Sequence, residues 1–248
     1  ASDIPSTGYK VFEIVDGTGA SFNPAATITT SASNIVMENN YYKITITPRG
    51  AISSLIDKTR NNQEFVKSGQ FLNDLGSSSG TLKIENNGAV SATVVATAAS
   101  PIAHKTSITL YAEINRIDIK NEITSNFNGT YTWAFNFNLT NPQLWHEELG
   151  AVIKADLLAN GGHYSPKFAR YDWFVMNHFA DIFDSGGFGI TLSNWDCQFF
   201  KYGNSTNTTL DNKTPKISVM AGFNASIKNQ GGDNYFLQRF SLKPHDGY

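Results

Sequence analysis

The sequence contains little cysteine, little charge and no long apolar run, and each shortage argues against a class of protein. Cys197 is the only cysteine, so the chain can form no internal disulfide and has no thiols for a zinc cluster. Charged residues make up 16% of the chain and the net charge is −2, which argues against a surface for nucleic acid or an anionic membrane. No stretch of about 18 apolar residues is present, so no segment is expected to span a membrane.

Neither a signal peptide nor a long amphipathic helix pattern is visible. The chain begins at Ala1-Ser2-Asp3, which fits a mature form or a piece cut at a domain boundary. Its 248 residues instead show period-two alternation between regular turn signals. A chain of this size buries roughly 70–75% of its unfolded surface, so it needs no covalent cross-link. We therefore predict an all-β fold, a large antiparallel β-sandwich.

The clearest hairpin lies within residues 38–66. Its first strand carries three apolar side chains on one face, at Tyr42, Ile44 and Ile46. The Pro48-Arg49-Gly50 turn reverses the chain, because proline presets one turn dihedral and glycine accepts a positive one. Alternation then predicts a shared face in the returning strand for Ile52, Ser54 and Ile56. A second polar turn over 57–62 precedes a third short strand.

Alternating apolar residues predict further strands over 81–85, 90–98, 108–112, 116–123, 152–158 and 188–193. Within 116–123 the side chains expected to face the core are Ile117, Ile119 and Ile123. Those expected to face outward are Arg116, Asp118, Lys120 and Glu122. An aromatic ladder follows at Tyr131, Trp133, Phe135, Phe137 and Leu139. We interpret the ladder as core, since one face of a two-layer sheet must be buried.

Three other segments carry weaker signals. Residues 9–15 are rich in β-forming side chains and predict a strand, whereas residues 16–34 are small and polar and predict a loop or link. The Trp145–Glu148 segment holds a His-x-Glu pair, which could serve a metal or acid–base site, but a solvated loop is the preferred interpretation. Six Asn-x-Ser/Thr sequons are best explained by the abundance of asparagine and threonine: Asn128, Asn138, Asn204, Asn207, Asn212 and Asn224.

Four phrases of the sequence resemble the C-terminal β-domain of glycoside hydrolase family 38, the α-mannosidases. Residues 38–58 match the family's strand Glu-Asn-x-Tyr-Tyr followed by Gly-x-Ile-x-Ser-Leu-x-Asp-Lys. Upstream, residues 5–11 match Pro-x-x-Gly-Tyr-x-Val, and residues 108–123 match a hairpin beginning Ile-x-Leu-Tyr. Residues 178–194 match the family's His-Arg-Trp-Ala-Asp-Leu-Ser followed by Tyr-Gly-Val-Ala-Leu-Leu-Asn-Asp-Cys. The ending Phe240–His245 is similar to the family's Phe-x-Tyr-x-Leu-x-Pro-His. Trp195 departs from the family, because it interrupts an Asn-Asp pair there.

The resemblance implies a galactose mutarotase-like supersandwich, with an N-terminal strand and linker over 1–34 and the β-sandwich domain over 35–248. For the whole enzyme it implies retaining hydrolysis of α-mannosides, with zinc on the sugar hydroxyls and two carboxylates as nucleophile and acid/base. Those groups belong to a separate N-terminal domain, so we assign no catalytic residue, cofactor or metal ligand to this chain. The expected partners are a carbohydrate (mannoside) or the catalytic domain, in a secreted, periplasmic or lysosomal compartment.

Trp195 and Asp196 are the candidate carbohydrate-binding residues. They follow the predicted strand 188–193, and a strand end opens into a loop where a side chain can point outward. An indole gives a sugar an apolar face, and a carboxylate accepts from its hydroxyls. The simpler interpretation is that Trp195 caps the core. Two further functions stay open: a free-standing carbohydrate-binding module, and a mutarotase-like sugar epimerase with a histidine acid and a glutamate base on one sheet face.

Overall fold

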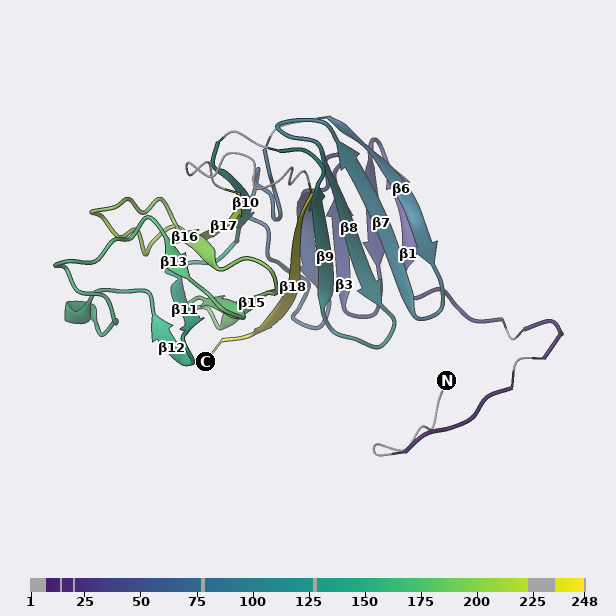
Figure 1. Ribbon diagram of the computed structural model, residues 1–248. Helices are drawn as coiled ribbons and strands as arrows, with labels where there is room; N and C mark the ends of the chain where they lie inside the picture. Colours follow the sequence, from purple (N-terminus) through teal and green to yellow (C-terminus); the bar gives the residue numbers. More distant parts are fainter. Residues whose placement is uncertain are drawn as a thin grey trace.

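The computed structural model describes residues 8–13, 15–19, 21–76, 79–126, 129–222 and 235–247, and within them the chain forms three antiparallel sheets (Figure 1). The large sheet runs in the order β12 (Ala151–Lys154), β11 (Gln143–Glu148), β14 (Phe179–Phe183), β15 (Phe188–Asn194), β18 (Phe236–Asp246), β9 (Ile117–Ile123), β8 (His104–Tyr111), β7 (Ser91–Ala98) and β6 (Gly80–Asn87). A second sheet contains β1 (Thr27–Ser31), β2 (Asn34–Glu38), β3 (Tyr42–Ile46), β4 (Ile52–Asp57) and β5 (Gln63–Glu64). A third contains β10 (Tyr131–Asn136), β17 (Lys216–Gly222), β16 (Phe199–Tyr202) and β13 (Phe174–Val175).

The two smaller sheets pack on the same face of the large sheet. The third sheet reaches it through Phe135, whose ring meets that of Phe240 edge to face at 5.5 Å. The second sheet reaches it through the turn at Gly50, where an added Cβ would lie 2.6 Å from Thr106 Cβ. One continuous hydrophobic core fills the space between the layers. The structure is thus a large antiparallel β-sandwich, as the sequence predicts. Among the described residues, no helix is long and apolar enough to cross a membrane. The element η1 (Leu158–Asn160) is a single short 3-10 turn.

The predicted core faces are largely confirmed. The aromatic ladder is buried at Trp133, Phe135 and Phe137, and the inward side chains of β9 are buried as well. The prediction fails on β4, where Ile52 and Leu55 are both fully buried. A β-bulge between Thr45 and Ile46 shifts the register, so the alternation changes face midway along β4.

Three local predictions are wrong. The described part of residues 9–15 joins no strand, whereas Thr27–Ser31, expected to be loop, forms β1 and pairs with β2. Residues 145–148 belong to β11 rather than to a solvated loop, and His146 is fully buried. The sequons at Asn128 and Asn224 lie outside the described residues.

Candidate functional site: a polar groove on the large sheet

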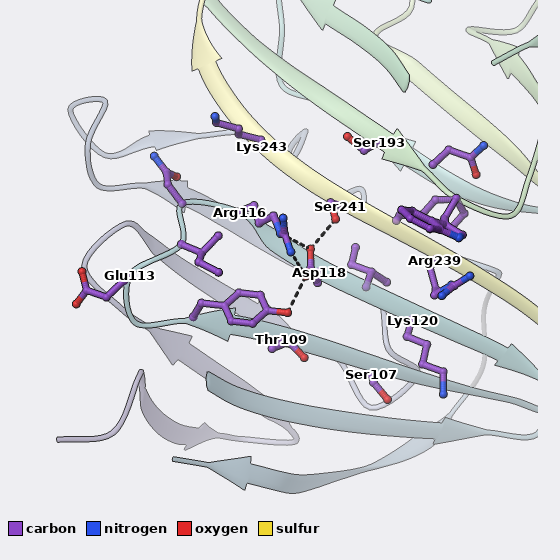
Figure 2. A pocket seen from close by; sticks show the side chains of 17 residues that line it. Ser107, Thr109, Glu113, Arg116, Asp118, Lys120, Ser193, Arg239, Ser241 and Lys243 are labelled. Carbon is purple, nitrogen blue, oxygen red and sulfur yellow. Dashed lines mark hydrogen bonds and ion pairs between the residues drawn. The ribbon is translucent and has the colours of Figure 1, made fainter. Parts of the chain in front are cut away.

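A groove of about 870 Å³ lies on the outer face of the large sheet, the face that the two smaller sheets leave uncovered (Figure 2). Strand alternation makes this face polar. Because Ile117 and Ile119 point into the core, Asp118 between them points outward, and on β18 the alternation of buried Phe240 with Ser241 has the same effect. Antiparallel pairing places these outward residues opposite one another, so that Ser241 faces Asp118 across the two strands.

The floor of the groove is organised around the carboxylate of Asp118. Tyr111 and Ser241 donate their hydroxyl groups to it at 2.7 and 2.5 Å. Arg116 forms an ion pair with it: Nη2 donates to Oδ2 at 3.2 Å, and Nε lies 3.0 Å from Oδ1. Burial, followed by the bond to Asp118, raises the pKa of Tyr111, and the bond to Asp118 raises the pKa of Arg116. Asp118 is therefore saturated with donors and holds the surrounding side chains in place.

A tryptophan forms one wall of the groove. Trp195 follows the end of β15 and is 78% exposed. The preceding Asn194 is buried, and its side-chain oxygen accepts from the Cys197 backbone N–H at 2.9 Å, which fixes the bend. The guanidinium carbon of Arg239 lies 5.4 Å from the centre of the Trp195 ring. The indole is thus presented to solvent from an ordered bend.

Asp196 orients the arginine beneath that wall. Its carboxylate accepts a two-pronged bond from Arg239, with Nε–Oδ2 at 2.9 Å and Nη2–Oδ1 at 2.8 Å. The backbone N–H of Arg239 donates to the same carboxylate at 2.9 Å. The bond to Asp196 raises the pKa of Arg239. Asp196 therefore acts on the groove through Arg239, while Trp195 lines it directly.

The histidines lie elsewhere, and none is among the residues that line this groove. His178 pairs with Glu147 at 2.6 Å, and His245 pairs with Asp181 at 2.8 Å. Burial lowers the pKa of His245, but the hydrogen bonds to Asp181 and to the Asp246 backbone, together with the charge of Asp181, outweigh burial, so the net shift is upward. Within the described ranges, no three histidine, cysteine or acidic side chains are grouped so as to hold a metal ion.

Of the two residues singled out from the sequence, Trp195 lines the groove and Asp196 lies behind it, and the sequence analysis missed most of their partners. Trp195 is exposed at the groove rather than capping the core, and Asp196 binds an arginine side chain. Arg239 and Ser241 were missed as site residues. The alternation of Arg239 and Ser241 with the apolar Phe240 and Leu242 is a signal that could have placed them on an outward face, but it does not reveal which residues they face.

The comparisons with known proteins support the fold. No protein-family model matches the sequence, and a search of curated proteins finds no significant match. Among solved structures, the chain is similar to a glycosyl hydrolase family 38 protein from Enterococcus faecalis, with a TM-score of 0.63, 12% identity, and 94% of this chain aligned to 32% of that one. It is similar to an α-mannosidase from Enterococcus faecalis V583, with a TM-score of 0.60, 13% identity, and 88% of this chain aligned to 30% of that one.

A third similar structure is a candidate mutarotase (YeaD) from Salmonella typhimurium, with a TM-score of 0.53 and 9% identity. That alignment covers 89% of this chain and 94% of the other. The chain thus spans about a third of the family 38 proteins but nearly the full length of the mutarotase-like one. All three alignments establish a shared galactose mutarotase-like fold, two of them with a region of family 38 α-mannosidase chains.

Proposed function

We propose that this chain is the non-catalytic C-terminal β-domain of an α-mannosidase-like glycoside hydrolase, and that its groove binds carbohydrate. The observation that carries the proposal is the exposed Trp195 ring on the wall of a polar groove. The fold supports the setting, because nearly the whole chain aligns with a part of two family 38 proteins. In such an enzyme the zinc-dependent chemistry would reside in a separate catalytic domain, which would be the natural partner of this one.

The arrangement suits a sugar for physical reasons. The apolar face of an indole stacks on the C–H face of a pyranose ring, and Arg239 beneath it limits the motion of the wall. Hydroxyl groups at Ser241 and Ser193 line the groove beside it and can bond to sugar hydroxyls. Concave sites with a few convergent polar groups are the usual form of small-molecule sites.

Titration of the purified chain with mannose oligosaccharides tests the proposal, with tryptophan fluorescence and calorimetry as readouts. We expect saturable binding that is lost in Trp195→Ala, an exposed position where the substitution should leave folding intact. Trp173→Phe is the matched control, because Trp173 does not line the groove. Binding that is absent in the unmodified chain, or that survives in Trp195→Ala, would contradict the proposal. The same titration would also detect binding by a free-standing carbohydrate-binding module. The coding sequence upstream of Ala1 distinguishes such a module from a domain of a larger glycoside hydrolase.

A sugar epimerase is the second candidate, favoured by the alignment with 94% of the mutarotase-like chain. Such an enzyme needs a histidine acid and a glutamate base that both reach one sugar. His178 and Glu147 are instead bonded to each other at 2.6 Å, which favours the binding domain. Polarimetry with α-anomers of common hexoses decides the question: we expect no acceleration of anomer exchange, and an acceleration lost in His178→Gln would establish the epimerase.

A further inference from the structure

We propose that the groove prefers acidic saccharides, with Lys243 and Arg116 contacting a sugar carboxylate. This inference rests on the proposed carbohydrate-binding function and names the class of its ligand. Four cationic residues line the groove, at Arg116, Lys120, Arg239 and Lys243, against the two acidic residues Glu113 and Asp118. The surplus is local, because the chain as a whole carries a net charge of −2.

Most of these charges are already paired. Asp118 is neutralised by Arg116 and further occupied by two hydroxyl donors. Arg239 is held by Asp196 at the Trp195 end. Lys120 pairs with Glu122, at 3.1 Å. These cations are thus partly satisfied already, and the paired Asp118 on the groove floor would not repel a saccharide carboxylate as a free charge would.

Lys243 differs from the other cations. Its side chain has no ion pair or hydrogen bond within the described part of the chain, and it is exposed on the outer face of β18. Its cross-strand neighbour is Thr191 of β15, which is uncharged. Arg116 bonds to Asp118 through Nε and Nη2. Its third nitrogen, Nη1, takes no part in that pair, so a lysine ammonium and one edge of a guanidinium are available to a carboxylate.

The strand geometry sets the size of the ligand. Lys243 and Arg239 lie on the same face of β18, four residues apart, which corresponds to about 13 Å. Figure 2 shows them along this strand, with Asp118 and Ser241 between them. A ligand that stacks on Trp195 and reaches Lys243 is therefore longer than one sugar ring. The geometry points to an oligosaccharide that carries a carboxylate on a sugar beyond the stacked one.

The decisive experiment compares two matched ligands by calorimetry. One is a 1,4-linked tetramer of mannuronic acid, and the other is its carboxyl-reduced counterpart, a tetramer of mannose with the same linkage. We expect tighter binding of the acid, weakened when NaCl is raised from about 50 to about 300 mM because screening shortens the range of the attraction. Lys243→Gln should lower the affinity for the acid about fivefold, in the upper range for an exposed ion pair, and leave the neutral tetramer unaffected.

Lys83→Gln is the matched control, because Lys83 is an exposed lysine of β6 that does not line the groove. It should change neither affinity. Equal binding of both tetramers with loss of both in Trp195→Ala would overturn the acidic preference while the carbohydrate-binding function stands. A preference for the acid that Lys243→Gln leaves intact would overturn the assignment of the carboxylate contact. Absence of binding by either tetramer would overturn both proposals.

Discussion

His146 provides a test of how this fold responds to pH. Its ring is fully buried in β11, where Nδ1 lies 2.6 Å from the Val175 carbonyl oxygen and Nε2 lies 3.0 Å from the Tyr164 hydroxyl. The carbonyl can only accept, so Nδ1 carries the hydrogen and Nε2 accepts from Tyr164. The rings of Phe174 and Phe200 pack against it. The neutral imidazole is therefore fully satisfied, and a proton added at Nε2 would replace the acceptor that Tyr164 uses.

The magnitude follows from linkage. Burial lowers the pKa of His146 from 6.5 to about 4. The unfolded chain therefore takes up a proton near pH 6.5, while the folded chain does so only near pH 4. The stability contributed by the neutral ring is complete above pH 6.5 and is lost as the pH falls toward 4. Between pH 7 and pH 5 the free energy of unfolding should fall by about 2 kcal/mol from this residue alone.

Urea unfolding at the two pH values measures this contribution. In the unmodified chain, several groups contribute to the pH dependence of the free energy of unfolding. His245 contributes in the opposite direction to His146, because its pKa is raised in the folded state. The comparison with His146→Gln isolates the ring: this variant should be less stable at pH 7, but its loss of stability from pH 7 to pH 5 should be smaller by about 2 kcal/mol. Leu72→Ala, a buried substitution, should keep the full pH dependence. Equal pH dependence in the unmodified chain and His146→Gln would refute the reasoning.

Three further predictions concern the core, the cysteine and activity. Phe135→Ala and Ile119→Ala should each lower the free energy of unfolding by about 2–5 kcal/mol, because both side chains are buried. Thr132→Ala, on the other face of β10, should lower it far less. A larger loss for Thr132→Ala in urea unfolding would disprove this register. Burial, aided by Asp196, raises the pKa of Cys197 to about 12, so iodoacetamide at pH 8 should label it much more slowly than it labels the urea-unfolded chain, and equal rates would contradict the structure. The isolated chain should not hydrolyse an aryl α-mannoside with zinc added, and turnover that persists through repurification would overturn the proposed non-catalytic role.

Most of the core faces along the regular strands could be predicted from the sequence alone. Period-two alternation identified the inward faces of β3 and β9 and the burial of the ladder at Trp133, Phe135 and Phe137. These predictions succeed because the alternation is a local property, and the removal of apolar side chains from water decides which face turns inward. The same logic identified Asp118 and Lys120 as outward residues. For Trp195 the sequence favoured a cap on the core over an outward position, and the structure exposes the ring.

Local patterns failed where long-range pairing decides the outcome. A bulge in the pairing of β3 with β4 buries Ile52 and Leu55 together, and no feature of β4 alone announces it. The β-rich residues 9–15 have strong strand propensity, but their described part finds no neighbouring strand in this structure. From the sequence, His146 was expected to lie in a solvated loop. Its burial depends on contacts with Tyr164 and Val175, which come from later segments of the chain.

The groove itself was decided by the tertiary structure. Ser241 bonds to Asp118 across 123 residues of sequence, and Arg239 bonds to Asp196 across 43. Both contacts exist because β18 pairs with β9 on one side and with β15 on the other, which brings three separate polar faces into one surface. Alternation fixes the face on which a side chain lies, but the partner opposite it depends on strand order and register, and those are set by the packing of the whole sandwich.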